Sequence, residues 1–288
     1  MQEVINIAIG TFAMRPYVFA FFAAYLIAGV FHLGWRAIFL FTVIGYLISF
    51  ASEFSSIHTG FPYGWYYYIN ATQGRELWIA GVPFFDSLSY VFLCYCSYST
   101  AIFILSPLKR SGFNLIPLET ISIRKSFAAL VVGSLLQVYL DIVTDPVALQ
   151  GNRWFLGQIY GYNTPGIHFG VPVSNYLGWW LVSAVMIFAL QRLAIRLPKN
   201  GNRPAGVTTF PLSQLLGVVL YLSVIAFNLT VALLIGEMTI AISSFFIVFL
   251  PFVLVFILAL RRINNYKKEE LGDHVRDFPW SPASISKK

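Results

Sequence analysis

The sequence predicts an all-α, polytopic integral membrane protein, a helical bundle of about seven transmembrane helices. Hydrophobic residues make up 58% of the 288 residues, charged residues only 11%, and the mean hydropathy is +0.72. The apolar residues gather in seven stretches, each close to the ~20 residues that a helix needs to cross the hydrocarbon core. The predicted spans are 16–34, 37–56, 79–105, 127–146, 172–193, 211–234 and 239–260.

The basic residues predict the orientation of these spans. Of the 19 Lys and Arg residues, 16 lie after odd-numbered spans, and only Arg15, Arg75 and Arg153 lie on the other side. Because cytoplasmic loops carry the excess of Lys and Arg, we expect the N-terminus outside, the C-terminus in the cytoplasm, and a multi-pass protein of the inner cell membrane. This bias and contact with anionic lipid account for the net charge of +7, so no nucleic-acid partner is expected.

The chain divides into one large part and one small part. Residues 1–260 are expected to form a single transmembrane catalytic domain, and 261–288 a basic cytoplasmic tail with a short amphipathic segment and a disordered end. The cytoplasmic loops 106–126 and 194–210 carry no catalytic pattern and are interpreted as connectors. Nothing in the pattern specifies an oligomeric state.

Four acidic residues lie inside or at the edge of the apolar stretches. They are Glu53, Asp86, Asp141 and Asp145. A charged side chain at mid-bilayer depth costs roughly 2.5 to 3.5 kcal/mol on insertion scales, so such residues are expected to face the protein interior and to serve a function. The predicted topology places all four in one layer near the outer surface.

Asp141 and Asp145 are four residues apart, so they share one face of a helix. Two carboxyl groups held that close in a low dielectric do not easily both ionise, and one of them is expected to keep its proton. The pair therefore supplies a proton donor beside a carboxylate.

Two long outer loops add aromatic and polar side chains to the same layer. Residues 52–68 and 147–171 are rich in Tyr, Trp and Phe, and they also contain His58 and His168. Half of these rings are explained by the aromatic belt of membrane proteins, but the belt does not explain the acids and histidines beside them. Within the spans, Gly133, Gly178 and Gly217 are candidates for close helix packing.

Several uses of the acids can be compared. An Asp-x-x-x-Asp pair suits the Mg²⁺ of a membrane prenyltransferase, but the outer layer offers a diphosphate only Arg75 and Arg153. A retinal photoreceptor needs a lysine within a span, and every Lys lies in a loop or the tail. A proton-coupled transporter stays open. The two cysteines, Cys94 and Cys96, point to opposite helix faces, and no metal site is predicted.

A set of residues in ordered blocks between about residues 50 and 180 forms a recognisable pattern. They are Glu53, Thr59, Gly60, Pro62, Tyr63, Gly64, Tyr66, Tyr68, Val82, Pro83, Asp141, Asp145, Pro146, Trp154, Gly170, Val171, Pro172, Asn175, Gly178 and Trp179. These blocks resemble the membrane carotenoid biosynthesis protein family, which includes γ-carotene 1′,2′-hydratase and bisanhydrobacterioruberin hydratase. After Asp145-Pro146, where the family pattern leads us to expect two aromatic residues separated by one residue, the chain has Arg153-Trp154-Phe155.

The resemblance implies a carotenoid end-group hydratase that protonates a terminal C=C and lets water capture the tertiary carbocation, with no cofactor. Asp141 or Asp145 is then the expected donor, and the other member or Glu53 tunes it, with Asp86 a further catalytic candidate. Tyr63, Tyr66, Trp154 and Trp179 are expected to shelter the cation, and Asn175 and His58 to hold hydrogen bonds. The alternatives are a carotenoid end-group cyclase, the Mg²⁺-dependent prenyltransferase, and a carotenoid- or lipid-binding transport protein without chemistry.

Overall fold

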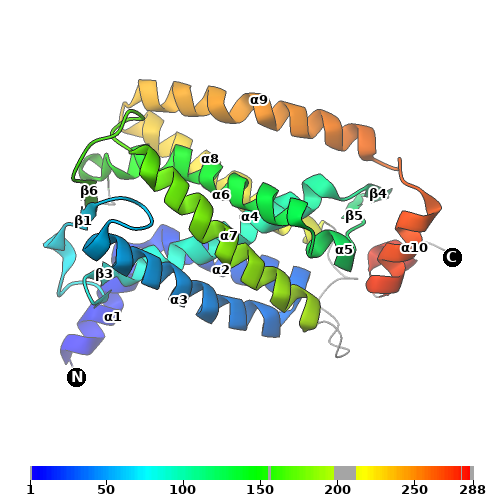
Figure 1. The fold of residues 1–288 in the computed structure, drawn as a ribbon, viewed down its shortest axis with the longest axis horizontal. Helices are drawn as coiled ribbons and strands as arrows, with labels where there is room; N and C mark the ends of the chain where they lie inside the picture. The colour runs from blue at the N-terminus through cyan, green and yellow to red at the C-terminus, as the bar shows by residue number, and fades with distance from the viewer. Residues whose placement is uncertain (1, 155–156, 198–211, 280, 286–288) are drawn as a thin grey trace.

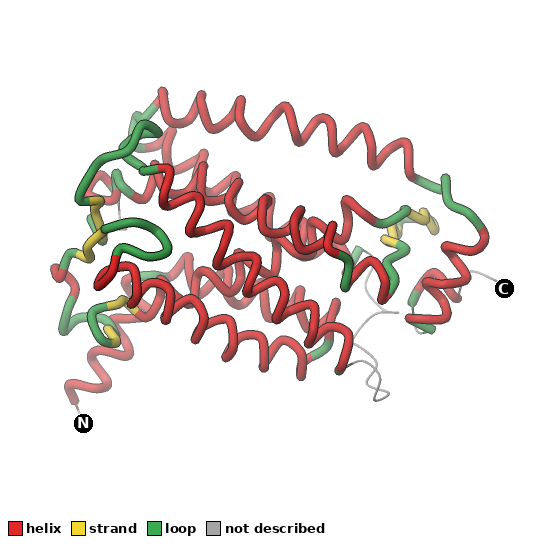
Figure 2. The backbone as a smooth tube through the Cα atoms, viewed as in Figure 1, coloured by secondary structure: helices red, strands yellow, loops and turns green. Residues whose placement is uncertain are grey.

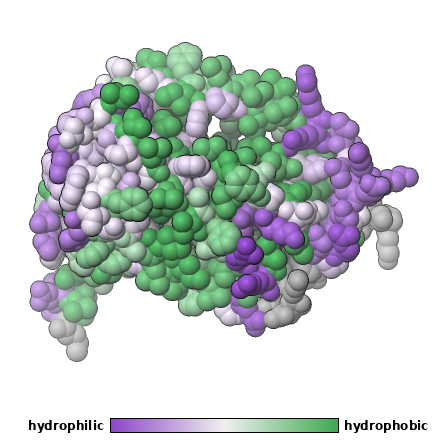
Figure 3. All heavy atoms as spheres, viewed as in Figure 1, coloured by the Kyte–Doolittle hydropathy of each residue, from purple (hydrophilic) through white to green (hydrophobic). Residues whose placement is uncertain are grey.

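Seven long apolar helices form the body of the protein in a computed structural model that describes residues 2–154, 157–197, 212–279 and 281–285. They lie side by side along the long axis of the molecule (Figure 1), and a band of apolar side chains covers much of the face drawn in Figure 3. The predicted all-α, polytopic membrane fold is therefore confirmed. The helices are α2 (Pro16–Leu33), α3 (Trp35–Thr59), α4 (Phe84–Leu105), α6 (Phe127–Ala148), α7 (Val173–Arg196), α8 (Leu216–Leu234) and α9 (Met238–Arg262).

Most predicted boundaries differ from the observed ones by only a few residues, but the third span begins later than predicted. Two short strands, β2 (Trp78–Ile79) and β3 (Val82–Pro83), pair antiparallel where the prediction had helix. Gly81 turns the chain between them with a φ of 84°, a conformation that favours glycine. The predicted start of the sixth span at Pro211 lies outside the described residues.

An additional helix, α1 (Gln2–Met14), precedes the first span and was not predicted. It ends at Met14, Arg15 follows as the N-cap of α2, and Pro16 begins α2 in the first-turn position where proline costs no helical hydrogen bond. Figure 1 shows α1 projecting at the end of the molecule where β1, β3 and β6 lie.

Close helix packing depends on glycines at the three predicted positions. A methyl group at Gly133 would lie 2.9 Å from Ile187 Cδ1, one at Gly178 2.7 Å from the Pro62 carbonyl oxygen, and one at Gly217 2.3 Å from Ser99 Oγ. At Gly178 the neighbour is backbone and cannot give way, so the contact of α7 with the loop requires glycine, whereas at Gly133 and Gly217 a side chain of α7 or α4 would have to shift. Helix α4 is buried along most of its length at the centre of the bundle, whereas α9 lies along its edge (Figure 1).

The two long outer loops pair with each other. Strand β1 (Tyr66–Tyr68) lies antiparallel to β6 (Tyr160–Tyr162), with Tyr66 opposite Tyr162 and Tyr68 opposite Tyr160. Figure 2 shows this small strand pair at one end of the helical bundle. Because side chains alternate along a strand, all four of these tyrosines project to one face of the pair, and Tyr67 projects to the other.

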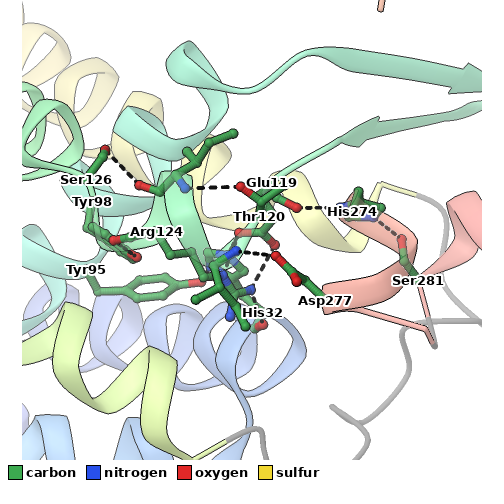
Figure 4. A network of polar contacts seen from close by, with 12 residues as sticks. His32, Tyr95, Tyr98, Glu119, Thr120, Arg124, Ser126, His274, Asp277 and Ser281 are labelled. Atoms are coloured by element: carbon green, nitrogen blue, oxygen red, sulfur yellow. Dashed lines mark hydrogen bonds and ion pairs between the residues drawn. The ribbon is translucent and has the colours of Figure 1, made fainter. Parts of the chain in front are cut away.

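The other end of the bundle carries a buried ionic network, drawn in Figure 4. The Arg124 guanidinium donates two hydrogen bonds to the Glu119 carboxylate, at 2.8 and 2.9 Å, and His32 Nε2 lies 3.2 Å from the same carboxylate. Burial alone would raise the pKa of Glu119, but Arg124 and His32 hold that pKa well below its usual range. The loop that contains Glu119 was predicted to be a plain connector; instead it forms the hairpin β4 (Leu108–Ser111) and β5 (Asn114–Pro117) and the short helix α5 (Ile121–Arg124).

The tail packs on this network through α10 (Lys268–Asp277), and the short α11 (Pro282–Ile285) follows. His274 Nδ1 donates to the Glu119 carbonyl oxygen at 2.6 Å, and the Asp277 carboxylate accepts from the Ile121 backbone N–H at 2.9 Å. The Arg124 guanidinium lies 4.3 Å from the centre of the Phe278 ring. The predicted amphipathic segment is thus a docked helix, and the predicted disorder at 286–288 lies outside the described residues.

Candidate functional site

The Asp141–Asp145 pair lies at the outer end of α6, and both side chains are buried. The Asn175 side-chain amide, on the first turn of α7, donates to Asp141 Oδ2 at 2.8 Å and to Asp145 Oδ2 at 2.9 Å. One amide nitrogen therefore bridges the two carboxyl groups and holds them close together. Two buried carboxyl groups held this close do not easily both ionise, so the pair is suited to hold one proton between them.

Asp145 differs from Asp141 in the number of donors around it. The hydroxyl groups of Tyr160 and Tyr162 each donate to Asp145 at 2.5 Å, one to each oxygen. Oδ1 of Asp141, in contrast, receives no hydrogen bond from a donor among the described residues. Donors stabilise the charged form of a carboxylate, so this arrangement favours charge on Asp145 and the proton on Asp141.

Glu53 and Asp86 form a second acidic group on the facing helices α3 and α4. Glu53 accepts hydrogen bonds from Ser49 Oγ at 2.8 Å and Ser87 Oγ at 2.7 Å. The Tyr68 hydroxyl donates to Asp86 at 2.6 Å and lies 3.5 Å from Glu53. Tyr68 therefore connects the two acids of this group.

The β1–β6 strand pair links the two acidic groups, because Tyr68 binds Asp86 while Tyr160, directly opposite Tyr68, binds Asp145. Burial raises the pKa of the Tyr68, Tyr160 and Tyr162 hydroxyls, and the neighbouring carboxylates raise it further. These phenols consequently stay protonated and act as donors. Tyr68 was noted only as a family match, and Tyr160 and Tyr162 were not predicted, although alternation of Tyr along both segments was the signal for them.

The two tyrosines of β6 form an aromatic pair separated by one residue, Tyr160-Gly161-Tyr162. This pair lies later in the chain than the segment at Arg153, where the family pattern led us to expect one. Phe155, in that earlier segment, lies outside the described residues. Trp154 itself is held by a hydrogen bond from its indole N–H to the Val147 carbonyl oxygen at 3.2 Å.

A cavity of about 150 Å³ lies beneath the strand pair, between α2, α3, α4, α6, α7 and α8. Three carboxylates, those of Glu53, Asp86 and Asp145, reach it, and no Lys, Arg or His occurs among its described lining residues. The rest of the wall is aromatic or apolar. Aromatic and other uncharged members of the lining include Tyr17, Phe21, Tyr63, Tyr66, Tyr68, Phe85, Tyr90, Phe92, Leu93, Trp154, Ile159, Tyr160, Tyr162, Asn175, Trp179, Val224, Phe227 and Asn228.

The cavity collects most of the residues that the sequence singled out. Tyr63, Tyr66, Trp154, Asn175 and Trp179 all line it. Trp179 stacks on Tyr90 with ring centres 4.3 Å apart. This arrangement surrounds the acids with π faces, which attract a positive charge.

Two of the predicted site residues do not line the cavity. Asp141 is not among the described lining residues, but Asn175, which lines the cavity, donates a hydrogen bond to it at 2.8 Å. His58 is exposed, and its Nδ1 lies 2.7 Å from the Phe54 carbonyl oxygen of its own helix. His168, in the later loop, lies 2.5 Å from the Tyr176 hydroxyl and is also outside the lining. The hydrogen-bonding role expected of His58 therefore has no partner in the cavity, whereas Asn175 holds both members of the acid pair.

A buried ion pair beside the site was not predicted. The Arg15 guanidinium binds both carboxylate oxygens of Glu76, at 2.8 and 3.0 Å, and neither side chain is more than 1% exposed. Arg15 also lies 4.4 Å from the centre of the Phe85 ring, next to Asp86. The pair fixes the corner between α1 and α2 against the start of α4, which positions Asp86.

The side chains around the cavity can be compared with those that a Mg²⁺-dependent prenyltransferase needs to bind a metal ion and a diphosphate. Among the residues that the structure describes, no group of three or more His, Cys, Asp or Glu side chains is arranged to hold a metal ion. The lining also lacks the basic side chains that a diphosphate needs. A cavity with acids, phenols and aromatic faces suits an uncharged apolar molecule that becomes a cation.

Fold and site together define a multi-pass α-helical membrane protein with a buried acidic and aromatic cavity near one membrane surface. The chain belongs to the carotenoid biosynthesis protein family, a model of which matches residues 3–251. A role in carotenoid biosynthesis follows from this membership, and it fits a hydrophobic substrate in a lipid environment. Comparison with curated proteins and with solved structures gave no significant match.

Proposed function

We propose that the protein is a carotenoid end-group hydratase that adds water across the terminal C=C of an acyclic carotenoid end. The observation that carries this proposal is the buried pair Asp141–Asp145, which Asn175 bridges and whose Asp145 lines an aromatic cavity beside two further acids. The reaction needs a strong acid, a sheltered carbocation and one water, and no redox step.

Asp145 is the proposed proton donor to the substrate, because it is the member of the pair that reaches the cavity. Asp141 holds the shared proton behind it, and Asn175 fixes both side chains in place. Proton transfer through Asp145 to the less substituted alkene carbon breaks the π bond and leaves a tertiary carbocation on the neighbouring carbon. A positioned acid of this kind accelerates such a step about 10² to 10⁴-fold.

The second acidic group is proposed to handle water. A water molecule bound at Asp86 attacks the carbocation through its oxygen, and its released proton passes to the Asp86 carboxylate. Asp86 and Asp145 both line the cavity, so the proton returns from Asp86 to the donor pair through water in the cavity. The sum is one alkene and one water converted to one tertiary alcohol.

The aromatic wall is proposed to protect the carbocation during its lifetime. The Tyr90–Trp179 stack and Tyr63 present π faces to the cavity, each worth up to ~2 kcal/mol for a desolvated cation. The cavity size favours hydration over the cyclase alternative. A cavity of about 150 Å³ accommodates a group about as large as benzene, which matches one terminal isoprene unit more closely than an end folded into a ring.

Incubation of the purified protein with lycopene in water enriched in heavy oxygen tests the proposal. We expect a product heavier than lycopene by one water, with the heavy oxygen in a tertiary alcohol. A product of unchanged mass with a new ring would support the cyclase. Unreacted lycopene would overturn the hydratase proposal and favour a binding or transport protein, and turnover only of a prenyl diphosphate with Mg²⁺ would favour the prenyltransferase.

A further inference from the structure

The cavity is too small for the whole of the substrate that the proposed function requires. Pockets that enclose drug-sized ligands measure about 300 to 1,000 Å³, and this one measures about 150 Å³. A carotenoid is about as long as the bilayer is thick, about 30 Å. Only its reacting end can occupy the cavity, so the rest of the polyene must pass through one of the walls.

The wall formed by α3 and α7 is closed. Any side chain at Gly178 would collide with Pro62 and Tyr63, and one at Gly45 would lie 3.1 Å from Met186 Cε. Gly178 therefore meets the backbone of the loop that follows α3 directly, and Gly45 packs tightly against the Met186 side chain. Tyr63 is also only 3% exposed, which leaves no passage beside it.

The outer wall is closed by the strand pair, whose tyrosine hydroxyl groups are bound to buried carboxylates. Opening this wall would separate several hydrogen bonds to charged groups, each worth about 1.5 to 3 kcal/mol. A fully apolar polyene would also have to cross a layer of polar atoms there. The polyene therefore does not leave the cavity through the outer wall.

The seam between α2 and α8 is different, because it is formed by aromatic side chains that are only half-buried. Phe21 on α2 meets Phe227 on α8 edge to face, with ring centres 5.6 Å apart, and Tyr17 stacks on Phe227 at 5.3 Å. All three rings line the cavity and are half-buried, and the chain neighbours of Phe21 and Phe227, Ala20 and Ala226, are exposed. Because both helices are long and apolar enough to span a membrane, we expect these exposed positions beside the seam to face lipid. Rotation of rings opens such a seam without moving backbone.

We propose that the α2–α8 seam is the lateral portal of the site, through which the polyene enters from the bilayer and in which its chain stays while the end reacts. This inference rests on the proposed function and deepens it. The substrate class it defines is a long, linear polyene with an acyclic end. A second cyclic end is compatible with it, because that end stays in the lipid.

Narrowing the seam tests the portal. Phe21→Trp and Phe227→Trp are compared with Phe249→Trp, a similar change on the 44% exposed Phe249 of α9. The substrates are lycopene and 2-methylhept-2-ene, which has the same isopropylidene end and no chain to accommodate. We expect the ratio of kcat/KM for lycopene to kcat/KM for the short alkene to fall about tenfold in Phe21→Trp and Phe227→Trp, because the larger side chain overfills the path of the polyene. The same ratio should stay unchanged in Phe249→Trp. An unchanged ratio in both seam variants would overturn the portal.

A second measurement separates this inference from the proposed reaction. The photoactivatable residue p-benzoylphenylalanine replaces Phe227 or, as the control, Phe249, and each protein is illuminated with lycopene. We expect a lycopene adduct at 227 well above that at 249, even if the wild-type protein hydrates nothing. Equal adducts at the two positions would overturn the portal while leaving the hydratase proposal intact.

Discussion

Removal of the tyrosine hydroxyl groups around Asp145 tests how the strand pair supports the site. Tyr160→Phe and Tyr162→Phe each delete one hydrogen bond of 2.5 Å to the carboxylate and leave the ring in place. A hydrogen bond to a charged group contributes about 1.5 to 3 kcal/mol, so each change should lower kcat/KM for lycopene roughly 10- to 150-fold. The double variant should lose less than the product of the two, because the bonds share one acceptor and Asn175 still donates to it.

Tyr67→Phe is the matched control for these variants. Tyr67 lies on the same strand pair, but it projects to the opposite face and is 50% exposed. The assay combines steady-state kinetics with the unfolding midpoint in detergent, and we expect Tyr67→Phe to leave both close to wild type. The reasoning is refuted if Tyr160→Phe and Tyr162→Phe are no more affected than Tyr67→Phe.

Three further predictions concern the aromatic wall, the helix contacts and the tail. Trp179→Leu should reduce kcat about 10- to 30-fold while Trp179→Phe retains most activity, because the π face stabilises the cation by up to ~2 kcal/mol; equal kinetics for both would contradict this role. Gly178→Ala should destabilise the fold by about 1 to 3 kcal/mol in detergent unfolding, whereas Gly272→Ala, at a site with open space, should not. Burial lowers the pKa of His274 from its usual 6.5, so docked α10 binds fewer protons than the undocked helix. Docking should thus be complete above about pH 6.5 and weaken as the pH falls, with faster hydrogen exchange in α10; His274→Asn should remove this pH dependence, and a profile identical to wild type would refute it.

Much of the fold could be predicted because the membrane imposes it. Apolar length alone located the seven spans, and the cost of burying charge identified the acids that reach the cavity. Glycine could be recognised as a packing residue, but its partners could not. The shift of the third span from residue 79 to Phe84 depends on the turn at Gly81, which an apolar run does not reveal.

The parts that were missed depend on contacts between distant segments. Strands β1 and β6 are three residues long and more than ninety residues apart, so neither contains enough pattern to predict their register. The Arg15–Glu76 and Arg124–His274 neighbourhoods likewise join separate elements. His58 was placed in an aromatic loop beside the acids because the second span was predicted to end at residue 56, but α3 continues to Thr59, and five residues of helix turn Glu53 and His58 to different faces.

The most direct test of the acid chemistry is the turnover of lycopene by Asp145→Asn and Asp141→Asn, with Asp273→Asn on the exposed face of α10 as control. The account predicts that both site variants still bind lycopene and lose about 10² to 10⁴-fold in kcat, while the control keeps the wild-type rate. Wild-type turnover by Asp145→Asn would contradict the assignment of proton transfer to this pair.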